Sequence, residues 1–424
     1  MRSGLWLLPG IRRFSTACAE ELASGRSLAV VTPAWLASDE FWALLRTELS
    51  GLGAWFHEVR LTTSDANDAP AALLGDRLDV AWEPRTAPRT AEYLCACELP
   101  NVVVVSGVGE LADEAQRRWL RFLGAWAEAA KSRADAGRRP VAMCFPLSAR
   151  EGLDAGLPDA DTHLSTKWLW AVPDALESHL LCRTVLGGSR DPESRWREHV
   201  LADFCGGDVQ LIELLWDTIL GSRDDVFVAL GSYAQEHGWD SEWLEGHGVA
   251  RLQRVAGDVT PTSGGPPGAW RPAWSCGLLS ATPEYGMEVH PAALVALGAI
   301  DDAEHRLWRG QARLLLPEID SLRMAMCRGL TQRFGRKWAF AHGQPILEEE
   351  QRAVRESPLA CGWGHLEFLV SRRKCFPEFL KWTPLLAAGR RIRNSLAHGR
   401  AIEFEDFVKL EAEASRSGLR EALI

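Results

Sequence analysis

Lysine is scarce in this chain, and long apolar runs are absent. Six Lys stand beside 41 Arg in 424 residues. Because a GC-rich genome produces the same bias, the arginine content alone does not indicate a function. No apolar run reaches the roughly 20 residues of a membrane-spanning helix, and residues 5–8 are too short for a secretory signal. We therefore expect a cytoplasmic protein without a membrane partner.

Clustered cysteines are also missing. The ten cysteines are scattered, and only Cys95 and Cys97 lie close together in the sequence. A lone Cys-x-Cys pair is not the spacing of a zinc site, so the pattern indicates no metal and no cofactor. We expect free thiols, most of them buried, in a reducing compartment.

The composition is typical of a globular protein with two or three domains. Hydrophobic residues make up 46% of the chain and charged residues 25%. Among the 19 tryptophans, we interpret six as core residues rather than as platforms on which bases stack: Trp119, Trp126, Trp168, Trp170, Trp239 and Trp243. Changes of pattern divide the chain into four segments: 1–158, 159–255, 256–302 and 303–424.

The first segment alternates short β-branched runs with helical patterns. Strands are expected at residues 5–8, 28–32, 55–61, 101–106 and 141–145, and helices at 14–23, 38–49 and 112–136. Four consecutive valines in the fourth run indicate a strand buried on both faces. This α/β pattern predicts a parallel sheet covered by helices on both sides.

The order of strand, glycine-containing turn and helix resembles the start of a P-loop NTPase, but its catalytic residues are missing. The turn Pro9-Gly10-Ile11-Arg12-Arg13-Phe14-Ser15 contains no Gly-Lys-Ser/Thr, so the phosphate-binding Lys and the magnesium-binding hydroxyl are absent. After the valine run, Ser106 stands where an acid should support the metal, and Glu110 comes four residues late. We therefore expect no ATP hydrolysis.

The second segment looks helical, with amphipathic stretches at 196–204 and 209–219 separated by Gly206-Gly207. Placed after the sheet, it resembles the helical lid of signal-transduction (STAND, AAA-like) ATPases. Residues 260–268 are too rich in Pro and Gly for a regular element and predict a linker.

A basic module follows in an otherwise acidic chain. Residues 305–400 contain 18 Lys and Arg but only 8 Asp and Glu, whereas the whole chain has a net charge of −10. Such a module suits phosphate binding. A solvated basic face, or attraction between the two parts, explains the charge equally well.

The segment Arg390-Arg391-Ile392-Arg393-Asn394-Ser395-Leu396-Ala397-His398-Gly399 lies in this module. Thr383-Pro384 is typical of a helix start and Gly399 of a helix stop. Leu385, Ile392 and Leu396 form an apolar stripe, and Arg391, Asn394 and His398 a polar one. Arg393 lies about 140° from His398 on an ideal helix. Either the helix is distorted near Arg393, or a second protomer completes the site.

This segment resembles the HEPN superfamily, whose signature is Arg, usually Asn, three further residues and His. The resemblance covers roughly residues 303–415 and implies an all-α bundle, with preceding helices at 303–338, kinked or broken at Pro317, and at 366–380. Gly364-His365-Leu366 resembles a step found in relatives, although no acid precedes it. By position, the resemblance implies Arg393, Asn394 and His398 as catalytic residues, with Arg390, Arg391 and Arg400 binding RNA.

Two functions follow from the resemblances. In the first, the chain is an effector of a bacterial conflict (anti-phage) system, in which an inactive NTPase-like part controls a metal-independent endoribonuclease that works as a homodimer. Relatives imply a chaperone-type AAA ATPase and a von Willebrand-type protein as partners. In the second, the bundle is a non-enzymatic adaptor that binds proteins or RNA. A third function consistent with the sequence is that of a regulator that binds nucleotide without hydrolysing it.

Overall fold

The computed structural model describes residues 8–33, 38–83, 86–150, 153–157, 161–170, 172–187, 189–249, 265–282, 284–342 and 347–419. The chain forms two compact units whose segments interleave along the sequence. Unit 1 comprises Met1–Leu181, Gly206–Val209 and Glu242–His290, and unit 2 comprises Cys182–Cys205, Gln210–Ser241 and Pro291–Ile424.

Unit 1 contains a five-stranded sheet in the order β2-β3-β4-β1-β5, with every neighbouring pair parallel. The four valines of β3 are completely buried, as expected for a central strand covered on both faces. The strands are β1 (Ser27–Thr32), β2 (Phe56–Arg60), β3 (Val102–Ser106), β4 (Ala142–Ser148) and β5 (Leu164–Trp168).

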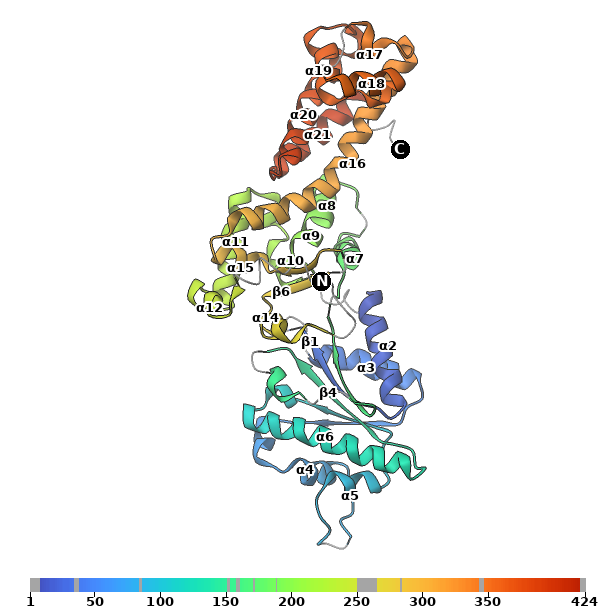
Figure 1. Ribbon diagram of the computed structural model, residues 1–424, viewed down its shortest axis with the longest axis vertical. Coiled ribbons are helices and arrows are strands. Elements are labelled where there is room, and N and C mark those ends of the chain that lie inside the picture. Colours follow the sequence, from blue (N-terminus) through green and yellow to red (C-terminus); the bar gives the residue numbers. More distant parts are fainter. Residues whose placement is uncertain are drawn as a thin grey trace. The chain divides into compact units, whose positions relative to one another are not determined.

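Helices cover both faces of this sheet (Figure 1). On one face, α2 and α3 bury Leu22, Phe41 and Leu45 against strand residues such as Val104. On the other face, α6 packs on β4 through the rings of Trp119 and Phe145. The α/β expectation is confirmed. The helices that lie wholly or mainly in unit 1 are α2 (Pro9–Ala23), α3 (Ser38–Gly51), α4 (Pro70–Arg77), α5 (Ala91–Ala96), α6 (Asp113–Asp135), α7 (Ala175–Val185), α12 (Ser241–Gly246) and α14 (Arg271–Ser275).

The predicted glycine-containing turn is wrong, because its residues are already helical. Helix α2 begins at Pro9, whose fixed φ suits a first helical turn. The backbone N–H of Gly10 donates a hydrogen bond to the buried carboxylate of Glu177. A side chain at Gly10 would collide with this carboxylate. The glycine thus accommodates a carboxylate of the same chain. Of the strand expected at 5–8, residues 5–7 lie outside the described residues.

Three strands interrupt regions expected to be helical or linker. Strand β5 lies inside the supposed helical segment, where Leu164, Ser165 and Trp168 are buried against the sheet. An antiparallel pair, β6 (Leu279–Thr282) and β7 (Gly286–Val289), occupies the supposed connector. These runs are too short to show a clear period. Of the predicted linker at 260–268, residues 260–264 lie outside the described residues.

Unit 2 is helical, and no strand occurs in the described part of residues 305–400, which comprises 305–342 and 347–400. The expectation that residues 303–424 are helical is confirmed for their described part, and the compact unit also contains Cys182–Cys205 and Gln210–Ser241, which precede the expected start. Its helices are α8 (Pro192–Trp196), α9 (Ala202–Phe204), α10 (Val209–Leu215), α11 (Arg223–Glu236), α15 (Pro291–Ala296), α16 (Ile300–Phe334), α17 (Trp338–Ala341), α18 (Glu348–Glu356), α19 (Trp363–Glu367), α20 (Thr383–Ala397) and α21 (Phe404–Ser417).

Two details of the predicted bundle need correction. Helix α16 is not broken at Pro317, because Leu315, Ile319 and Leu322 are buried on either side of it and outweigh the cost of the proline. The stretch 366–380 is not one helix. A π-helical turn (Phe368–Arg372) ends before Lys374, whose φ is 50°, and a 3-10 helix begins at Pro377.

The two amphipathic stretches expected before the bundle are helical. The first spans α8, a π-helical turn (Arg197–Leu201) and α9, and the second begins with α10. Gly206 and Gly207 both have positive φ values, 60° and 86°, and separate them. Within the described residues, no helix combines the length and the apolarity needed to cross a membrane.

Candidate functional site

Helix α20 carries the predicted motif and is one uninterrupted α-helix from Thr383 to Ala397. Leu385, Ile392 and Leu396 are buried, which confirms the apolar stripe. Gly399 has a φ of +69°, the left-handed conformation expected of a helix stop. Thr383 does not cap the helix. Its backbone is already helical, and its hydroxyl accepts a hydrogen bond from Ser371 at 3.2 Å.

The end of α20 is fixed on the long helix α16. The indole N–H of Trp308 donates to the carbonyl oxygen of Leu396 at 2.8 Å. The buried amide of Gln311 makes two bonds to the backbone of Ile402, one of 2.9 Å to its carbonyl and one of 2.8 Å from its N–H. Residues 398–401 are therefore held between two anchored points.

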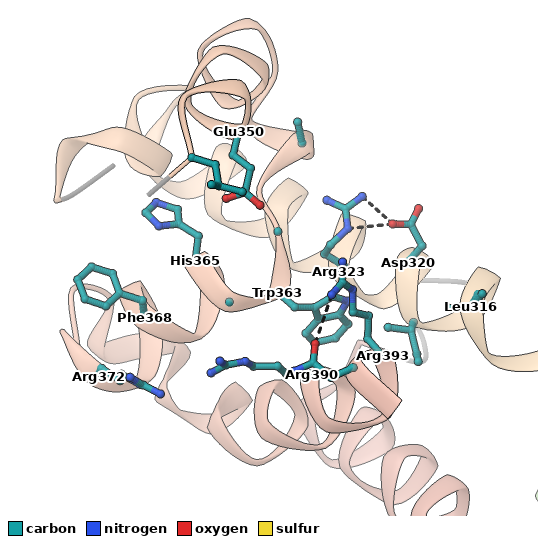
Figure 2. Close-up of a pocket in the computed structure, with 16 residues that line it drawn as sticks. Leu316, Asp320, Arg323, Glu350, Trp363, His365, Phe368, Arg372, Arg390 and Arg393 are labelled. Carbon is teal, nitrogen blue, oxygen red and sulfur yellow. Dashed lines mark hydrogen bonds and ion pairs between the residues drawn. The ribbon is translucent and has the colours of Figure 1, made fainter. Parts of the chain in front are cut away.

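A cavity of about 870 Å³ opens beside the middle of α20. Residues from α16, α18, α19, the π-helical turn and α20 line it, all within unit 2 (Figure 2). The polar lining consists of four arginines, two acids, one histidine and one asparagine. These residues are Arg323, Arg372, Arg390, Arg393, Asp320, Glu350, His365 and Asn394. A volume of this size accommodates a nucleotide-sized ligand.

Two of the cavity arginines are held by carboxylates. Arg390 forms an ion pair with Glu367. Arg323 binds Asp320 at 2.7 Å and also donates to the carbonyl oxygens of Leu359 and Cys361, so it fixes the wall of the cavity. These contacts neutralise part of the positive charge and orient both side chains.

The other two arginines lack an acidic partner among the described residues. Arg393 donates to the side-chain oxygen of Asn394 at 3.3 Å. The exposed side chain of Arg372 makes no hydrogen bond or ion pair within the described part of the chain. A guanidinium with free N–H groups is suited to bind a phosphate.

Aromatic residues build the rest of the wall. Trp363 is 6% exposed and its ring lies against Gly389 of α20. His365 lies near Phe368 with its ring stacked, and its Nε2 bonds the carbonyl oxygen of Ala339 at 2.8 Å. Because a carbonyl only accepts, this Nε2 carries the proton.

Three of the six residues predicted for the site lie outside the cavity. Arg391 forms an ion pair with Asp406 of α21. His398 and Arg400 are exposed beyond the end of α20 and do not line the cavity. The structure thus brings Arg390, Arg393 and Asn394 together but leaves His398 apart. Since α20 is continuous, distortion near Arg393 does not join His398 to the cavity.

Sequence reasoning missed two cavity arginines. Arg372 begins the basic run Arg372-Arg373-Lys374, which is a readable signal within the basic module. Arg323 gives no such signal, because its position on α16 becomes significant only through tertiary packing. Within the described residues, no group of three or more His, Cys, Asp or Glu is arranged to hold a metal.

Comparison with family models, with curated proteins and with solved structures finds no match to this chain.

Proposed function

We propose that unit 2 is a HEPN-like module that binds RNA at the arginine-lined cavity and cleaves it without a metal. One observation carries the proposal: the motif residues Arg390, Arg393 and Asn394 line a nucleotide-sized cavity together with further arginines. This concentration of guanidinium groups favours a polyanion. In this proposal the chain is an effector of a bacterial conflict system.

The chemistry needs groups that hold a phosphodiester and move protons. Arg393 binds two phosphate oxygens, and Asn394 adds one neutral hydrogen bond. The ribose 2′-oxygen attacks phosphorus while the bond from phosphorus to the 5′-oxygen breaks. The 2′-hydroxyl proton goes to a base, and the leaving 5′-oxygen receives a proton from an acid. An imidazole can serve both steps. Because His398 lies outside the cavity of its own chain, the cavity takes His398 from a second protomer.

We assign unit 1 the role of a regulatory part that no longer hydrolyses ATP. In this proposal, residues 1–158 are a P-loop-NTPase-like domain and the helices of 159–255, most of which belong to unit 2, are a lid as in signal-transduction ATPases. The all-parallel sheet supports it, as does the strand β3 that ends at Ser106 without an acid. Partners of this part are a chaperone-type AAA ATPase and a von Willebrand-type protein.

An RNA-cleavage assay in the presence of EDTA tests the proposal. The wild-type protein should cleave RNA, and His398→Ala should lower the rate by about 10²–10⁴-fold while the fold is kept. Arg393→Ala should also lower it, whereas Asn394→Ala should cost less because it removes one neutral hydrogen bond. Cleavage should fall steeply with salt, as arginine contacts to phosphates release counterions. Absence of any RNA binding would reject the proposal.

A non-enzymatic adaptor is the second candidate, and specific contacts favour it. Arg390 and Arg391 are each engaged by a carboxylate of the bundle, as structural residues are. His398 does not line the cavity. On this alternative, His398→Ala lowers the melting temperature, and the variant shows the same level of RNA cleavage as the wild-type protein.

A further inference from the structure

Arg372 is a cavity arginine that lies outside the motif on α20. It ends the π-helical turn Phe368–Arg372, whereas Arg390 and Arg393 lie on α20. In Figure 2, Arg372 and Phe368 lie at the left of the cavity and Arg393 at the right, with Arg390 between them. The cavity arginines are therefore spread along it.

An arginine that is already paired with a carboxylate binds an added anion less favourably than an unpaired one, because the anion must displace the carboxylate. A phosphate at Arg390 must compete with Glu367, and one at Arg323 must compete with Asp320. Arg372 and Arg393 have no carboxylate partner among the described residues. Phosphate contacts are strongest at guanidinium groups whose N–H donors are not already used. The two unneutralised arginines are thus the anion-binding ends of the cavity.

Two separated anion sites suit a strand rather than a single phosphate. A nucleic-acid strand repeats its phosphates at regular intervals, and basic grooves that bind single strands follow this backbone. The volume of about 870 Å³ leaves room for a nucleoside between the two ends. A duplex, whose paired bases face inward, cannot place a nucleoside in such a cavity without unpairing.

We infer that Arg372 binds the phosphate next to the one bound at Arg393, so that a single RNA strand runs along the cavity from α20 to the π-helical turn. The inference rests on the RNA binding of the proposed function and is independent of whether the strand is cleaved. It gives Arg372 a role in binding, and it gives the site a minimum ligand of two phosphates with a nucleoside between them.

The neighbouring Arg373 provides a matched control. It is also exposed and also carries a guanidinium, but this group lies over the ring of Phe368, 5.2 Å from its centre. Arg373 does not line the cavity. Arg372→Ala and Arg373→Ala therefore each remove one positive charge from adjacent, exposed positions. Neither substitution breaks an ion pair among the described residues.

The test measures binding of a fluorescein-labelled, ten-nucleotide single-stranded RNA with 2′-O-methyl riboses, which cannot be cleaved by attack of a 2′-hydroxyl. Anisotropy titrations at several salt concentrations give the affinity and the slope of log K against log salt. Arg372→Ala should weaken binding roughly tenfold and reduce the slope by about 0.7. Arg373→Ala should change the affinity less than twofold, and both variants should melt at the wild-type temperature.

The outcomes separate this inference from the proposed function. If wild type binds the RNA and Arg393→Ala weakens binding, but Arg372→Ala binds like wild type, the inference is wrong and the proposed function stands. Equal losses in Arg372→Ala and Arg373→Ala would mean a diffuse basic surface and would also overturn the inference. If wild type does not bind the RNA at all, the proposed function fails and the inference fails with it.

Discussion

The ring of Trp363 lies so close to Gly389 that no side chain fits between them. A Cβ atom added to Gly389 would be 2.5 Å from the nearest ring carbon. Trp363 thereby packs directly on the backbone of the helix that carries Arg390 and Arg393, and it forms the wall of the cavity. We predict that Gly389→Ala destabilises the protein by about 1–3 kcal/mol, because a tightly packed ring must move. Urea denaturation measures this change.

Gly364→Ala is the control for this prediction. Gly364 also lies on a helix that lines the cavity, but a Cβ added there meets nothing within 4 Å. Alanine is favoured over glycine within a helix by up to about 1 kcal/mol. The control should therefore be neutral or stabilising. Equal effects of the two substitutions would show that Trp363 does not hold Gly389.

The purified protein should not hydrolyse ATP. No lysine precedes Lys131, so the first strands and turns contain no residue able to act as the phosphate-binding lysine. Ser106 ends β3 where a metal-supporting acid is needed. Each missing group removes electrostatic stabilisation of the transition state. Phosphate release with Mg-ATP should stay at the level of the protein-free blank, and turnover abolished by changing Arg12 or Arg13 would contradict the prediction.

Most thiols of the native protein should be unreactive. Seven of the ten cysteines are buried, and Cys97, Cys276 and Cys375 are partly exposed. Burial raises the pKa of the Cys18 and Cys182 thiols to about 12. The reactive thiolate forms only as the pH approaches the pKa, so these two remain thiols from pH 7 to 9.

A thiol titration at pH 8 measures this reactivity. No more than three cysteines should react rapidly without denaturant, and all ten should react in guanidinium chloride. Rapid reaction of five or more in the native protein would contradict the buried positions.

The sequence pattern predicted those helices and strands whose buried residues repeat with the period of a single element. The four valines of β3 and the stripe Leu385, Ile392 and Leu396 each placed an element correctly, because burial repeats along one strand or one helix. The stop at Gly399 was also predictable, since a left-handed residue at a helix end favours glycine.

Contacts between distant residues were not predictable in this way. Gly10 looked like part of a phosphate-binding turn, yet it bonds Glu177, which lies 167 positions away. The cavity depends on similar contacts, since Arg323, Arg372 and Trp363 come from three separate elements. A periodic sequence pattern carries no information about which residues of separate elements come into contact. Three of the six residues predicted from the motif line the cavity. The remaining lining residues come together there only through tertiary packing.

The central claim is that Arg393 of one protomer and His398 of another form one RNA-cleaving site. Mixing the inactive variants Arg393→Ala and His398→Ala tests it most directly. In a mixed dimer, one of the two sites combines both mutations and the other is intact. After the protomers exchange, half of the dimers are mixed, so the mixture should regain about a quarter of the wild-type cleavage rate in EDTA. A mixture that stays inactive while wild type cleaves RNA would contradict the shared site.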